Sequence, residues 1–140
     1  MRMADIFESP ADAERAFYEA FEQADLRAMR RVWADVRNVV CIHPLNEPVV
    51  GPRAVLKSWE QMFEKGPEMH FRVRVQDKTL TEDLATHLVT EYIRVSGETA
   101  ERPPIIATNI YRYCSDGWRM ILHHASPIAD RRSKPRHKVH

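Results

Sequence analysis

The sequence predicts an α+β fold in which one curved antiparallel sheet wraps around three helices from the first half of the chain. Two observations predict it. Apolar residues recur at helical spacing in three segments before residue 66, whereas from residue 69 to residue 126 they follow the two-residue period of half-buried strands. The expected order is helix, helix, strand, helix and then four antiparallel strands, whose concave face must be filled or form a pocket.

Each predicted helix has a recognisable start. Ser9 is a good N-cap for the first helix, with Pro10 at its first position, and the second helix starts after Asp25. The third helix begins at Pro52 and is expected to end at Gly66. The residues expected on the buried sides are Ala13, Ala16, Phe17, Ala20, Phe21 and Ala24, then Leu26, Met29, Val32 and Trp33, and then Val55, Leu56, Trp59, Met62 and Phe63.

The strands are bounded by turn-forming residues. The β-rich segment "RNVVCIH" precedes Pro44, which cannot donate to a central ladder. Four further strands are expected over about 69–80, 85–96, 105–113 and 118–126, separated by "TED", "SGETAERPP" and "CSDG". Short connections of this kind make neighbouring strands antiparallel.

The composition fits one soluble globular domain. The chain has 140 residues, of which 44% are hydrophobic and 29% are charged. The domain is expected over 10–127, between an N-terminal arm at 1–9 and a basic, disordered tail at 128–140. Residues 131–140 hold five Lys or Arg and no acid, so removing these five charges from the net charge of +1 leaves −4 for the rest.

These features predict a cytoplasmic protein with neither nucleic-acid nor membrane partners. The acidic body lacks a basic face interleaved with aromatic residues, no apolar run is long enough to cross a bilayer, and the start of the chain lacks the apolar core of a secretory signal. Cys41 and Cys114 are expected to be free thiols, and no metal or cofactor is expected.

Histidines occur at two distant places and could face one space. His43 ends the first strand, and His123 and His124 are neighbours on the last. Because successive side chains on a regular strand point to opposite faces, only one of these neighbours can face inward. His124 is expected to be that one, since its face is the more apolar, with Trp118, Met120 and Leu122.

The partner of His124 on the preceding strand depends on the loop between the two strands. A four-residue loop pairs Tyr113 with Trp118 and places Asn109 on the face of His124. A three-residue loop would place Thr108 there instead, because a shift of one residue exchanges the two faces.

The segments "QADLRAMRRVWAD", "CIHP", "GPRAVLKSWEQMF" and "NIYRYCSDGWRMILHHASP" resemble, in this order, the nuclear transport factor-like superfamily. Within it, they are most similar to SnoaL-like and ketosteroid isomerase-like domains. The resemblance covers about residues 10–127. It implies a cone-shaped α+β barrel, a pocket between the sheet and the helices, and commonly a homodimer formed through the outer face of the sheet.

The resemblance also implies roles for single residues. His43 stands where the isomerases carry a catalytic aspartate before a proline, and Asn109 where they carry an acidic group that stabilises an oxyanion. Phe17 replaces a catalytic tyrosine, and Trp59 matches an aromatic residue of the pocket. With two of these chemistries changed or missing, steroid isomerase activity is not expected, although the pocket can persist.

The leading hypothesis is a homodimer that binds a small, largely apolar organic molecule carrying a carbonyl or hydroxyl. A cofactor-free isomerase, cyclase or hydratase-like reaction would use His43 as general base and Asn109 as oxyanion donor, with His124 as a third polar contact. A buried histidine bonded to the backbone, and a buried asparagine that satisfies its neighbours, are the structural alternatives. The expected ligand-binding residues are Phe17, Trp59, Leu88, Tyr92, Tyr111, Met120 and Leu122.

The second hypothesis is a non-catalytic association module that resembles the association domain of a calmodulin-dependent kinase. Its functional surface would be the outward face of the sheet. An open cavity favours ligand binding, whereas a cavity plugged by Trp59, Tyr111 and Tyr113 favours association. The residues expected on the outward face are Arg112, Arg119, Ile121 and His123.

Overall fold

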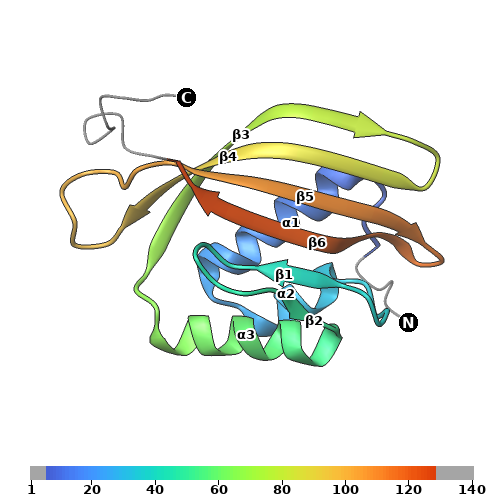
Figure 1. The fold of residues 1–140 in the computed structure, drawn as a ribbon, viewed down its shortest axis with the longest axis horizontal. Helices are drawn as coiled ribbons and strands as arrows, with labels where there is room; N and C mark the ends of the chain where they lie inside the picture. The colour runs from blue at the N-terminus through green and yellow to red at the C-terminus, as the bar shows by residue number, and fades with distance from the viewer. Residues whose placement is uncertain (1–5, 129–140) are drawn as a thin grey trace, which may run out of the picture.

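The computed structural model describes residues 6–128, which form three helices and one curved six-stranded sheet (Figure 1). The sheet order is β2-β1-β6-β5-β4-β3, and the helices cover its concave side. The predicted α+β cone-like fold is confirmed. The elements are α1 (Pro10–Gln23), α2 (Leu26–Val32), β1 (Val40–Ile42), β2 (Val49–Val50), α3 (Pro52–Lys65), β3 (Met69–Leu80), β4 (Leu84–Val95), β5 (Ile105–Cys114) and β6 (Gly117–Pro127).

The helix starts follow from local capping. The side chain of Ser9 accepts a hydrogen bond from the backbone N–H of Asp12, and Asp25 does the same for Ala28, each at 3.0 Å. α1 ends where Ala24 adopts a left-handed conformation with φ of 53°. Ala24 therefore leaves the buried side on which it was expected and is exposed.

The sheet is mixed, and the expectation of a purely antiparallel sheet is wrong. β1 pairs in parallel with β6, with Val40 opposite Leu122 and Ile42 opposite His124. β2, which was not expected, pairs antiparallel with β1. Two residues are too few to display an alternating pattern, so this strand left no signal in the sequence.

The core lies between α1, α3 and the concave face of the sheet. Phe17 and Trp59 are fully buried, and their ring centroids lie 5.5 Å apart in an edge-to-face arrangement. Tyr111 and Met120 are also fully buried. The N-terminal arm is described only from residue 6, and the basic tail lies outside the described residues apart from Ile128.

Candidate functional site

A β-bulge in β6 decides which histidine faces the interior. Tyr113 pairs with Trp118 as expected, but the register shifts between Ile110 and Tyr111, so that Ile121 is an extra residue. Beyond the bulge, the residues of β6 that strict alternation would place on the inner face lie on the outer face, and the reverse. His123 is 1% exposed and lies opposite the buried Asn109, whereas His124 is exposed. The expectation that His124 faces inward is therefore wrong.

Three expected ligand-binding residues lie on the outer face of the sheet. Leu88 pairs with Thr108 and is 37% exposed, and the Arg72 guanidinium lies 4.1 Å from the centre of the Tyr92 ring. Leu122 follows the bulge and has therefore changed face. Phe17, Trp59, Tyr111 and Met120 do face the interior, as the alternation of their elements predicts.

An inner cavity of about 360 Å³ opens between the sheet, the end of α1, the end of α3 and the β4–β5 loop. Its wall is largely apolar, and three of its polar residues, Glu91, His43 and His123, are buried. Such a space is typical of a small-molecule site. The lining of this cavity includes Phe21, His43, Met62, Met69, Glu91 and His123.

Glu91, on β4, is the buried acid of this cavity. It is 2% exposed, and its Oε2 accepts a hydrogen bond of 2.6 Å from the hydroxyl of Tyr18. Burial raises the pKa of Glu91 to about 7, and the charge of Glu14 acts in the same direction, while the Tyr18 hydrogen bond opposes them. A carboxyl group with this pKa can both give and take a proton near neutral pH.

Asn109 lies behind Glu91 rather than in the cavity wall. Its amide nitrogen donates to Glu14 Oε2 and to the Tyr18 hydroxyl, each at 3.1 Å. Its oxygen lies 2.6 Å from His123 Nδ1. Because these contacts occupy both ends of the amide, Asn109 orients its buried neighbours and is not placed to donate to a ligand.

Glu14, on α1, is the second buried acid. Its Oε2 also accepts a hydrogen bond of 2.8 Å from the Tyr111 hydroxyl, and its Oε1 lies 3.1 Å from His87 Nδ1, an ion-pair distance without hydrogen-bond alignment. Burial acts to raise the pKa of Glu14, but its contacts with His87, Asn109 and Tyr111 together hold that pKa below its ordinary value. Of the two buried acids, Glu14 and Glu91, Glu14 is therefore the one that is ionised at neutral pH.

The two cavity histidines are neutral at physiological pH. Burial, joined by the charges of His43 and His124, lowers the pKa of His123 to about 3, and burial lowers the pKa of His43. His123 Nδ1 faces the Asn109 oxygen, so the proton resides on Nδ1 and Nε2 is free to accept. That Nε2 lies 4.0 Å from Glu91 Oε2.

His43 lines the cavity as expected, and its tautomer follows from its partner. Its Nε2 lies 3.1 Å from Ser58 Oγ, whose own proton is donated to the Val55 carbonyl at 2.7 Å. Nε2 of His43 must therefore carry the proton. Burial also raises the pKa of the Cys41 thiol, which lies 3.6 Å from the same nitrogen, so a thiolate nucleophile does not form there.

Arg102 stands in the cavity wall, on the β4–β5 loop. Its guanidinium binds Glu98 through two hydrogen bonds of 3.1 and 2.7 Å, and its backbone N–H donates to the Ile93 carbonyl. Among residues 6–128, no group of three or more His, Cys, Asp or Glu side chains is arranged to hold a metal ion.

Glu91 and its supporting residues were missed, although β4 carried a signal. Alternate positions of this strand are Ala85, His87, Val89, Glu91, Ile93 and Val95, which places a histidine and a glutamate on an otherwise apolar face. A charged residue on the core face of a strand is rarely buried unless it is paired. Such a pattern indicates an internal polar site.

Comparisons with known proteins agree with the fold. The model of the SnoaL-like domain family matches residues 11–130. A structure from Thiobacillus denitrificans, named as a candidate calcium/calmodulin-dependent protein kinase type II association domain, is 43% identical. It has a TM-score of 0.87, and the match covers 90% of this chain and 100% of that one. A candidate dehydratase of the NTF2-like family from Streptomyces avermitilis is 30% identical, with a TM-score of 0.76 over 84% of this chain and 92% of that one.

A plant protein matches this chain over part of its greater length. The F-box protein SKIP8 of Arabidopsis thaliana is 28% identical over 110 residues, which are 79% of this chain and 46% of the plant protein. The chain therefore spans about half the length of this curated relative. None of the helices within residues 6–128 is long and apolar enough to cross a membrane. With the family model matched over most of its length, the chain belongs to the SnoaL-like domain family.

Proposed function

We propose that the inner cavity binds a small, largely apolar molecule carrying a carbonyl or hydroxyl, and that Glu91 exchanges a proton with it. The observation that supports this proposal is a carboxyl group of raised pKa, 2% exposed, in the wall of an apolar cavity. The reaction class is cofactor-free acid–base chemistry of the isomerase, cyclase or hydratase type. The candidate dehydratase among the relatives is consistent with this class.

Glu91 replaces His43 as the principal proton-transfer group. In its ionised form Glu91 removes a proton from the carbon beside a carbonyl; the C–H bond breaks and its electron pair forms an enolate. The neutral acid then returns a proton to that carbon or to a neighbouring one. The Tyr18 hydroxyl fixes the carboxyl group, and His43 and the free Nε2 of His123 are placed to accept hydrogen bonds from the ligand or to orient it.

Exchange of the α-protons of 2-tetralone in D₂O, followed by proton NMR, tests the proton transfer without knowledge of the natural substrate. The wild-type protein should exchange these protons faster than buffer alone, and Glu91→Gln should lose at least about 100-fold of the protein-dependent rate. Because the base must be ionised, the rate should rise with pH through about 7 and then level off. His43→Ala should show weaker binding of the probe.

Glu60→Gln is the matched control, since Glu60 is exposed on α3 and outside the cavity wall. It should exchange the probe like the wild type. Wild-type exchange at the rate of buffer alone, or equal rates for Glu91→Gln and the wild type, would contradict the role of Glu91.

We also propose that two copies of the chain associate through the outer face of the sheet. The relative named for an association domain supports this, as do Leu88, Ile110 and Leu122, which lie on that face with only partial burial. Of the residues expected on this outward face, His123 lies on the inner face instead, and Arg119 is buried. The cytoplasmic location and the lack of nucleic-acid and membrane partners stay predictions.

Leu88→Glu should convert a dimer to a monomer in sedimentation velocity, because it places charges on both sides of the interface. Glu60→Gln should keep the wild-type mass. A wild-type protein that sediments as a monomer would contradict the association, and one that keeps its dimeric mass in Leu88→Glu would exclude this face.

A further inference from the structure

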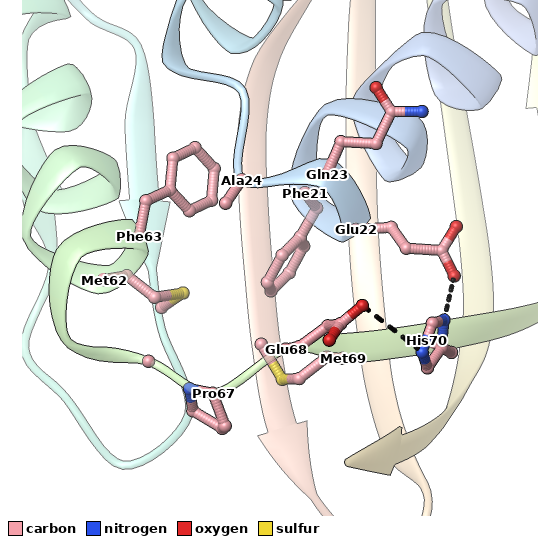
Figure 2. A pocket seen from close by; sticks show the side chains of 11 residues that line it. Phe21, Glu22, Gln23, Ala24, Met62, Phe63, Pro67, Glu68, Met69 and His70 are labelled. Atoms are coloured by element: carbon pink, nitrogen blue, oxygen red, sulfur yellow. Dashed lines mark ion pairs between the residues drawn. The ribbon is translucent and has the colours of Figure 1, made fainter. Parts of the chain in front are cut away.

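A second, outer cavity of about 680 Å³ lies beside the inner one, between the end of α1, the end of α3 and the start of β3 (Figure 2). Phe63 and Met62 approach it from α3, and Phe21 from α1. At its edge, His70 Nδ1 lies 3.4 Å from Glu22 Oε2, and His70 Nε2 lies 3.9 Å from Glu68 Oε2. The outer cavity therefore combines an apolar floor with an acidic rim.

Three side chains, those of Phe21, Met62 and Met69, line both cavities. They come from three different elements, α1, α3 and β3, which meet at this point. Since each of them borders both spaces, the two cavities adjoin at these three side chains.

The two methionines are the movable part of this layer. Phe21 is held by aromatic neighbours, with ring centroids at 4.4 Å from Phe71 and 4.7 Å from Trp59. Met62 and Met69 are only partly buried and have unbranched side chains with several rotatable bonds. The two methionine side chains can therefore change rotamer more easily than the Phe21 ring can move.

We propose that the outer cavity is the second compartment of the ligand site, and that an apolar chain passes between Met62 and Met69 from the inner cavity into it. This inference rests on the function proposed above, since it places the oxygen-bearing end of the ligand at Glu91. Continuity with the inner cavity identifies the occupant as the far end of the same molecule. Because Glu22 and Glu68 form the rim, the chain should end in an uncharged group rather than a carboxylate.

The test compares 4-methylacetophenone with 4-hexylacetophenone, which share a head group and differ by five methylenes. A buried methylene adds about fourfold in affinity. We expect the hexyl compound to bind the wild-type protein at least about tenfold more tightly, by ligand-observed NMR. Replacing the terminal methyl of its chain by a carboxylate should remove this gain.

Glu68→Trp places an indole in the outer cavity without changing the inner wall, because Glu68 lines only the outer space. This variant should bind the hexyl compound at least about tenfold more weakly than the wild type does, and it should bind the methyl compound with unchanged affinity. Glu60→Trp, outside both cavities, should leave the binding of both compounds unchanged. Retained binding of the methyl compound shows that each variant is folded.

The outcomes separate this inference from the function on which it rests. If the methyl compound binds but the hexyl compound binds no more tightly, or if Glu68→Trp leaves the binding of the hexyl compound unchanged, the second compartment is excluded and the inner site stands. If neither compound binds the wild-type protein, both proposals are overturned.

Discussion

Replacing Glu14 with alanine is expected to lower the free energy of unfolding by about 3–5 kcal/mol, because it removes the acceptor of two buried hydrogen bonds, at about 1–3 kcal/mol for each donor left unsatisfied. Glu14 accepts hydrogen bonds from Asn109 and Tyr111 and lies next to His87, and all three partners are buried. Without the carboxylate, the Tyr111 hydroxyl and one of the two hydrogen bonds of the Asn109 amide lose their buried acceptor. Urea denaturation at pH 7, followed by circular dichroism, measures the change.

Two variants on the same helix serve as controls for this prediction. Glu14→Gln keeps one carbonyl oxygen for the Asn109 and Tyr111 donors. Its free energy of unfolding should therefore fall roughly half as far as that of Glu14→Ala. Glu19→Ala changes an exposed residue of α1, so its free energy of unfolding should stay within about 0.5 kcal/mol of that of the wild type. If Glu14→Ala resembles Glu19→Ala, the buried network does not hold α1 against the sheet.

Glu91 should make the protein less stable as the pH rises, and Glu91→Gln should remove this effect. The folded protein keeps the Glu91 proton up to about pH 7, whereas the unfolded chain releases it near the ordinary pKa of 4.5. Between these values the folded state binds more protons, so the free energy of unfolding falls with rising pH. The accumulated loss is about 3 kcal/mol, at about 1.4 kcal/mol per pKa unit.

The difference between the two proteins isolates this contribution. At pH 5 the free energies of unfolding should lie within about 1 kcal/mol of each other, and at pH 8 Glu91→Gln should be more stable by about 3 kcal/mol. His123 has the opposite sign, because its pKa of about 3 removes stability as the pH falls below 6.5, but it is present in both proteins and cancels. A pH-independent difference would show that Glu91 is ionised in the folded state throughout this range.

The parts of the fold that depend on local chemistry were predictable. Ser9, Asp25 and Pro52 mark helix starts through caps and a fixed φ angle, and these signals do not depend on distant contacts. The parallel pairing of β1 is different, because it joins Val40 to Leu122 across about eighty residues of chain. Nothing near β1 in the sequence encodes that partner.

The candidate site was predictable only in part. His43 and Asn109 were placed in the interior correctly, but the bulge at Ile121 was invisible because Met120, Ile121 and Leu122 are all apolar. The alternation of apolar and polar residues cannot reveal a one-residue insertion in such a run. The inward-facing histidine was therefore predicted as His124 instead of His123. Glu91 was not predicted, although it is a charged residue on the buried, otherwise largely apolar face of β4.

The parallel contact between β1 and β6 also constrains the order of assembly during synthesis. The ribosome produces β1 long before the strand beside which it must lie, and until β6 emerges β5 has an open edge. The His43 side of the cavity is therefore closed late, by a contact of large sequence separation that forms slowly. A nascent chain halted before β6 would expose the apolar lining of the incomplete inner cavity and the unpaired edge of β5. Molecular chaperones bind surfaces of this kind.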